Sequence, residues 1–171
     1  QIDSLLKWTG KKLDEIENVI VSIGPGSFTG VRIAISVVKG LFFGRNVNFY
    51  EVYELDALGF QGYYNLKASL GNDEDVKIYS MIVSRKEKIY CAGYETLSEN
   101  KLKLVKNYEV TKLDNVIDEI IENKGNNKKF YLIGDAVFNY KAKILDKLGN
   151  CMKIFEDKNL TINTMTFVQM F

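Results

Sequence analysis

The feature that most constrains the fold is a glycine-rich turn at residues 24–30, which reads Gly-Pro-Gly-Ser-Phe-Thr-Gly. The turn holds the only proline of the chain and three of its 13 glycines. The run before it, 19–23, is rich in β-branched residues, which predicts a buried strand. The residues after it, about 29–43, repeat their apolar side chains with a helical period. The sequence therefore predicts a strand that turns tightly through glycines into a helix.

A turn of this kind can bind an anion or a nucleotide, because backbone N–H groups and a helix N-terminus converge there. The residues expected to make such contacts are Gly24, Gly26, Ser27, Thr29 and Gly30. Ser27 or Thr29 is expected to cap the helix. The phosphate-binding Walker A motif is excluded, because no lysine follows Gly30.

The same glycines have the spacing of a relaxed dinucleotide-binding loop, and Glu51 lies about twenty residues further on. Against this interpretation, Pro25 removes a backbone donor and the third glycine is offset from the standard motif. The residues alone leave three hypotheses open. The turn is purely structural, it binds an anion, or it belongs to a nucleotide-binding enzyme of the Rossmann type.

The rest of the chain alternates strands and helices and predicts an α/β fold with mixed sheets covered by helices. A strand at 47–52 and a helix at 55–66 precede a polar break at 71–75, which indicates a lobe of residues 1–70 and a second lobe of 71–171. In the second lobe, strands are predicted at 76–83, 89–94, 102–110, 130–133 and 152–155, and helices at 113–121 and 136–148.

The helix predicted at 29–43 has an apolar arc of roughly 200°, which is wider than one sheet can bury. We therefore expect it to form a subunit contact beside a short helix at 2–9. Ala34 or Val38 is expected to point outward, while Arg32 and Lys39 share a polar stripe and are either solvated or paired across the contact. The predicted interface residues are Val31, Ala34, Ile35, Val38, Leu41, Phe42 and Leu5.

The composition excludes several classes of site. The chain has no histidine, which removes Ser–His and Cys–His couples and every zinc site that needs His. Cys91 and Cys151 form no CxxC pair, so no metal knuckle or redox motif is predicted. The net charge of +1 favours only weak binding to nucleic acid. No run of eighteen apolar residues or signal peptide is present, so a cytoplasmic protein without a membrane segment is expected.

Three segments together resemble the TsaB (YeaZ) family, whose members take part in forming threonylcarbamoyladenosine (t6A) beside the tRNA anticodon. They are Gly-Pro-Gly-Ser-Phe-Thr-Gly-Val-Arg-Ile at 24–33 with Lys39-Gly40-Leu41, Ser-Arg-Lys-Glu-Lys-Ile-Tyr at 84–90, and Tyr-Leu-Ile-Gly-Asp at 131–135. One departure is Val83, where the family usually has Asp. Asp135 is expected to cap the helix that follows it.

The resemblance implies a reduced actin-like (ribonuclease H-like) fold of two lobes, whose first strands are missing from this chain. It also implies a non-catalytic subunit that supports the transferase TsaD, with TsaE contributing ATPase activity and a homodimer forming when TsaD is absent. No metal and no cofactor of its own are expected, with ATP or ADP at a subunit interface as the remaining option.

Overall fold

The computed structural model describes residues 1–67, 76–97, 101–123, 129–149, 152–154 and 162–170. The chain divides into two compact units, Gln1–Tyr53 and Glu54–Phe171. The lobe boundary was predicted at 70/71. The structure divides the chain earlier because the helix that follows Tyr53 buries its apolar side chains against the sheet of the second unit.

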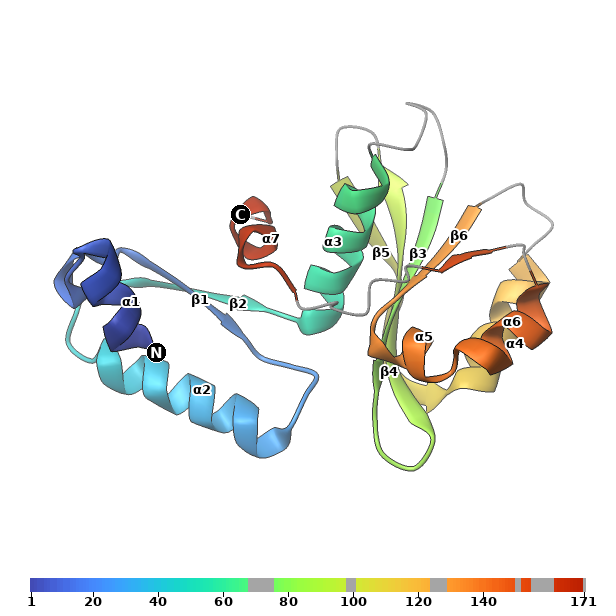
Figure 1. Cartoon of the computed structure of the whole chain (residues 1–171), viewed down its shortest axis with the longest axis horizontal. Coiled ribbons are helices and arrows are strands. Elements are labelled where there is room, and N and C mark those ends of the chain that lie inside the picture. The colour runs from blue at the N-terminus through green and yellow to red at the C-terminus, as the bar shows by residue number, and fades with distance from the viewer. Residues whose placement is uncertain (68–75, 98–100, 124–128, 150–151, 155–161, 171) are drawn as a thin grey trace. The chain divides into compact units, whose positions relative to one another are not determined.

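The first unit has the predicted strand, turn and helix at its centre (Figure 1). Helix α1 (Ile2–Thr9) ends at Gly10, whose φ of 68° is left-handed, and a short 3-10 turn, η1 (Leu13–Glu15), follows. Strands β1 (Asn18–Ser22) and β2 (Asn48–Val52) pair in parallel, and helix α2 (Phe28–Leu41) connects them. The unit is thus a β-α-β crossover, preceded along the chain by helix α1.

The second unit is built on a mixed five-stranded sheet of order β5-β4-β3-β6-β7. β3 (Val76–Val83), β4 (Lys88–Leu97) and β5 (Lys101–Lys112) correspond to three predicted strands and form an antiparallel meander. β6 (Lys129–Ile133) pairs in parallel with β3 and with β7 (Met152–Ile154). The predicted mixed sheet is confirmed.

Helices cover both faces of this sheet (Figure 1). Helix α3 (Glu54–Lys67) packs on one face against the side chains of Ile78 and Ile133. Helices α4 (Leu113–Glu122), α5 (Asp135–Asn139) and α6 (Lys141–Leu148) pack on the other face against Tyr79, Met81 and Leu132. A last helix, α7 (Thr164–Gln169), lies against α3. Alternate residues of β3 therefore serve two cores.

Two predictions for the second unit are corrected. The single helix expected at 136–148 is two helices, because the chain leaves helical geometry at Tyr140, with φ of −111° and ψ of 18°. Asp135 is the first residue of α5 and does not cap it, since Gly134 is the cap residue. The turn at Arg85–Lys88 is an exposed hairpin, with positive φ at Lys86 and Glu87.

Candidate functional site

The glycine turn is held by two short-range contacts from serine side chains. The Gly24 N–H donates to Ser22 Oγ at 3.4 Å, and the peptide bond between Gly24 and Pro25 is cis. Gly24 has a φ of +103°, a conformation that favours glycine. The Gly30 N–H donates to Ser27 Oγ at 3.4 Å, so Ser27 and not Thr29 caps α2. Capping sets the helix start at Phe28.

The predicted anion contacts lie close together on this turn. Gly24 is buried, while Gly26, Ser27, Thr29 and Gly30 are exposed. Ser27 already accepts the Gly30 N–H, and its carbonyl accepts the Val31 N–H at 2.9 Å. Nothing further in the structure points to a bound anion or nucleotide there, so this role stays a prediction. Glu51 is exposed in β2, where it pairs across the sheet with Val21.

The inner face of α2 packs against β1. Most of the predicted interface residues lie on this face. Val31, Ile35, Val38 and Leu41 are half-buried there. Phe42, just past the helix end, is buried, and its ring meets Phe49 edge-on with 6.2 Å between the ring centroids. These five side chains stabilise the first unit itself. Of the predicted interface residues, only Ala34 and Leu5 are exposed.

The outer face of α2 presents apolar side chains that the first unit leaves uncovered. The exposed fractions are 66% for Phe28, 58% for Ile33 and 45% for Val37. Of the two residues expected to point outward, Ala34 is exposed and Val38 is half-buried, and Ile33 and Val37 are further outward apolar positions. Sequence reasoning missed them because helical periodicity gives the width of an apolar arc and does not show which part meets the sheet.

A shallow groove of about 380 Å³ runs along this outer face. Within it the Arg32 guanidinium lies over the Phe28 ring, 3.8 Å from the ring centroid. The groove is lined by Phe28, Thr29, Arg32, Ile33, Ser36 and Val37. We call these six residues the α2 outer face.

Helix α1 adds a second apolar surface to the first unit. None of its residues is buried, and Leu5 and Trp8 are 57% and 84% exposed. A groove of about 580 Å³ separates α1 from the end of α2. Its apolar lining comes from Ile2, Leu6, Leu13 and Leu41. A monomer thus exposes apolar area on both helices, which is typical of a protein–protein contact surface.

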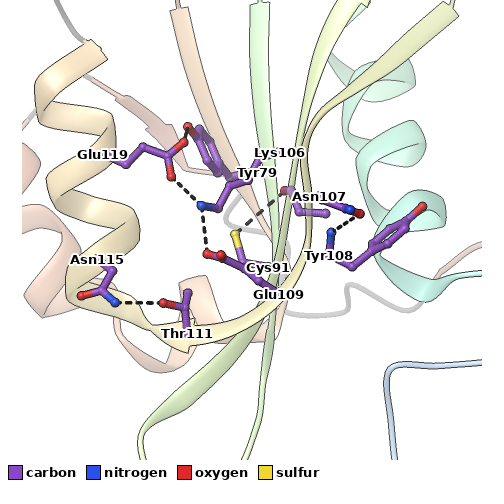
Figure 2. A network of polar contacts seen from close by, with 10 residues as sticks. Tyr79, Cys91, Lys106, Asn107, Tyr108, Glu109, Thr111, Asn115 and Glu119 are labelled. Atoms are coloured by element: carbon purple, nitrogen blue, oxygen red, sulfur yellow. Dashed lines mark hydrogen bonds and ion pairs between the residues drawn. The ribbon is translucent and has the colours of Figure 1, made fainter.

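One group of polar side chains in the second unit forms a structural network around Glu119. Figure 2 shows Glu119 of α4 between Tyr79 and Lys106, with a hydrogen bond of 2.8 Å from the tyrosine hydroxyl and an ion pair of 2.5 Å to the lysine. Lys106 also pairs with Glu109 at 2.9 Å. The network fastens α4 to β3 and β5. A pair that is only partly desolvated in this way stabilises the fold more than an exposed pair does.

Cys91 of β4 lies beside this network and is fully buried. Burial is the main cause that raises the pKa of the Cys91 thiol, to about 12. The neutral thiol is a poor nucleophile, because the thiolate is the reactive form. Cys151 lies outside the described residues. Among the residues that the structure describes, no three His, Cys, Asp or Glu side chains gather closely enough to hold a metal ion.

Comparisons with known proteins agree on one family. The family model described as TsaD, tRNA N6-adenosine threonylcarbamoyltransferase, matches residues 1–162. The tRNA threonylcarbamoyladenosine biosynthesis protein TsaB of Buchnera aphidicola subsp. Baizongia pistaciae is 28% identical over 152 residues, which are 86% of this chain and 62% of that protein. This chain therefore spans less than two thirds of that relative.

Two solved structures share the fold. A Pseudomonas aeruginosa protein described as similar to peptidase YEAZ superposes with a TM-score of 0.61 at 24% identity, over 77% of this chain and 56% of that one. YeaZ from Pseudomonas aeruginosa superposes with a TM-score of 0.53 at 28% identity, over 64% of this chain and 48% of that one. The fold is accordingly the actin-like one expected from the resemblance.

None of the helices described is both long and apolar enough to cross a membrane. The family model covers nearly the whole chain, and the relative and the solved structures agree with it. The chain thus belongs to the TsaD family and, within it, to the TsaB (YeaZ) group.

Proposed function

We propose that this chain is a non-catalytic partner subunit in the formation of t6A in tRNA, and that it acts by binding the transferase TsaD through α2. The observation that carries the proposal is the α2 outer face. Phe28, Ile33 and Val37 are about half exposed or more on one well-formed helix. Burial of such side chains against a partner is favourable by about 25 cal/mol per Å² of apolar surface.

The absence of a catalytic role is supported by the chemistry of the side chains. No histidine is available as a general base anywhere in the sequence. The thiol of Cys91 is buried and has a raised pKa. The carboxylate of Glu119 is held by Tyr79 and Lys106. We accordingly expect purified protein to show neither threonylcarbamoyl transfer nor peptidase activity without TsaD.

The first experiment asks whether cells need the protein for t6A. Depletion of the protein should lower the t6A content of tRNA, measured by mass spectrometry of hydrolysed nucleosides. Unchanged t6A after complete depletion would overturn the proposal. We also expect the isolated protein to bind tRNA only weakly and in a salt-sensitive way, since the net charge is +1.

The second experiment tests the surface. Ile33→Glu and Val37→Glu each place a charge on the outer face of α2, where the side chain is already exposed, so the fold should persist by circular dichroism. Each should weaken binding to TsaD by at least about tenfold, because a desolvated charge opposes an apolar contact. Val168→Glu is the matched control, since Val168 of α7 is 60% exposed. Val38→Glu is unsuited to this test, because Val38 is half-buried on the inner face.

Unchanged binding of both Ile33→Glu and Val37→Glu would show that α2 is not the contact. We further propose that TsaE acts with the same assembly and that two copies of this chain pair through α2 when TsaD is absent. Sedimentation of the purified chain, with and without TsaD, measures both the homodimer and its exchange for the heteromer.

A further inference from the structure

The ionisable side chains of α2 are all positively charged. Arg32 and Lys39 are its only ionisable residues, both are exposed, and the helix holds no Asp or Glu. Among the described residues, no carboxylate lies within ion-pair distance of either cation. At 100° per residue, Arg32, Ser36 and Lys39 share one stripe beside Ile33. The α2 outer face is therefore apolar with a cationic margin.

Arg32 is preorganised to receive an anion. Its guanidinium carbon lies over the Phe28 ring, 3.8 Å from the centroid, one helical turn away. A guanidinium stacked on a ring keeps its edge N–H donors free for a bidentate carboxylate. Because the stack already restricts the side chain, less rotamer entropy is lost on binding.

A second copy of this chain is a poor electrostatic complement for that face. A two-fold contact places the same patch against itself, so cations of one copy would approach cations of the other. The carboxylates near α1 are already paired. Asp3 pairs with Lys7, Asp14 with Arg45 and Glu15 with Lys11. Like charges across an interface select against a partner.

The remaining carboxylates of the first unit belong to neither helix. Glu17 directly precedes β1, and Glu51 is in β2. We infer that the α2 outer face selects a partner that presents a carboxylate to Arg32 within an otherwise apolar helical surface. The heteromeric contact is thereby favoured over pairing of two copies. This inference rests on the proposed function and adds the chemistry by which α2 distinguishes its partners.

The test compares self-association with binding to TsaD of the same organism, by analytical ultracentrifugation at 50 mM and 500 mM NaCl. For the unmodified chain, higher salt should weaken binding to TsaD, because it screens the attraction between Arg32 and the partner's carboxylate. It should strengthen the homodimer, because it screens the repulsion between the cations of the two copies. Arg32→Glu should weaken TsaD binding by at least about tenfold and should not weaken the homodimer. Arg32→Gln should give an intermediate loss, and it covers the case in which Arg32→Glu fails to fold.

Arg85→Glu is the matched control, because it makes the same change of net charge at an exposed hairpin turn of the second unit. It should leave both associations within about twofold. Restored binding of Arg32→Glu to a TsaD variant with lysine at one acidic position would identify the carboxylate. Equal binding of TsaD by the unmodified chain and Arg32→Glu would overturn this inference alone. Lack of any binding between the unmodified chain and TsaD would overturn the proposed function as well.

Discussion

The backbone N–H of Val83 donates a hydrogen bond of 2.8 Å to the Oδ1 atom of Asp135, 52 residues further along the chain. The contact joins the end of β3 to the start of α5. Because Val83 contributes only its main chain, the residue type at position 83 does not decide whether the bond forms. The carboxylate that the resemblance places at position 83 is absent here, and the carboxylate at this strand end comes from Asp135.

Replacing Asp135 should cost stability. Asp135→Ala removes the acceptor of the Val83 N–H, and a lost hydrogen bond to a charged group costs about 1.5–3 kcal/mol. Asp135→Asn keeps an oxygen acceptor and should lose less. Urea unfolding followed by circular dichroism measures both variants. Equal losses for Ala and Asn would show that the hydrogen bond is not what matters at this position.

Gly134→Ala should be the most damaging of the substitutions considered. Gly134 has a φ of +116°, and a Cβ there would lie 2.0 Å from the carbonyl oxygen of Met81 in the neighbouring strand. Backbone atoms cannot move away as a side chain can, so the loss should exceed about 3 kcal/mol. The readout is the yield of folded protein and its urea midpoint.

Gly149→Ala is the control for that experiment. Gly149 also has positive φ, 59°, but a Cβ there meets nothing within 4 Å. Its cost should be limited to backbone strain of about 1–3 kcal/mol. If both alanine variants unfold at the same urea concentration, the clash with Met81 is not the cause of the Gly134 effect.

Ser80→Ala should stabilise the second unit. Ser80 is fully buried in β3, and its Oγ has no hydrogen-bond partner. The loss of an unsatisfied buried hydroxyl removes a desolvation cost of about 1 kcal/mol or more. The pocket is narrow, since a Cβ on Gly59 would lie 3.1 Å from Ser80 Oγ, so alanine fits and valine should not. A lower thermal midpoint for Ser80→Ala than for the parent would contradict this account.

The contribution of the Glu119 network to the free energy of unfolding should be lost at acid pH. Burial raises the pKa of Glu119, but the hydrogen bonds from Lys106 and Tyr79 outweigh it, so the pKa lies below its ordinary value. A carboxylate with a lowered folded-state pKa contributes stability above its unfolded pKa of about 4.3, and that stability is lost as pH falls through the folded value. The free energy of unfolding should therefore fall below about pH 4.

Glu119→Gln is the matched variant, because it keeps the shape and loses the titration. Its free energy of unfolding should be lower than that of the parent at pH 7, and the difference should shrink between about pH 4 and pH 2. Urea titrations at a series of pH values give the comparison. A difference that stays constant over this range would rule out ionisation of Glu119 as the source.

Much of the local structure follows from the sequence alone. The β-branched run before Gly24, the Ser27 cap and the helical period after it act between residues close along the chain, and they predicted β1, the turn and α2. The three strands that form the antiparallel meander were also predicted from the sequence, at 76–83, 89–94 and 102–110. The motif at 24–33 indicated the family, because a ten-residue match of unusual composition is specific.

Only the tertiary structure decided relationships between residues far apart in the chain. It placed Val38 inward and Ile33 outward on α2, because the side of an apolar arc that meets the sheet depends on the position of β1. It joined α3 to the second unit, because Gly59 and Gly62 let the helix approach Tyr94 and Ile133 closely. Periodicity and propensity describe a single helix or strand. The contacts between elements depend on how several of them pack together, which the local sequence does not determine.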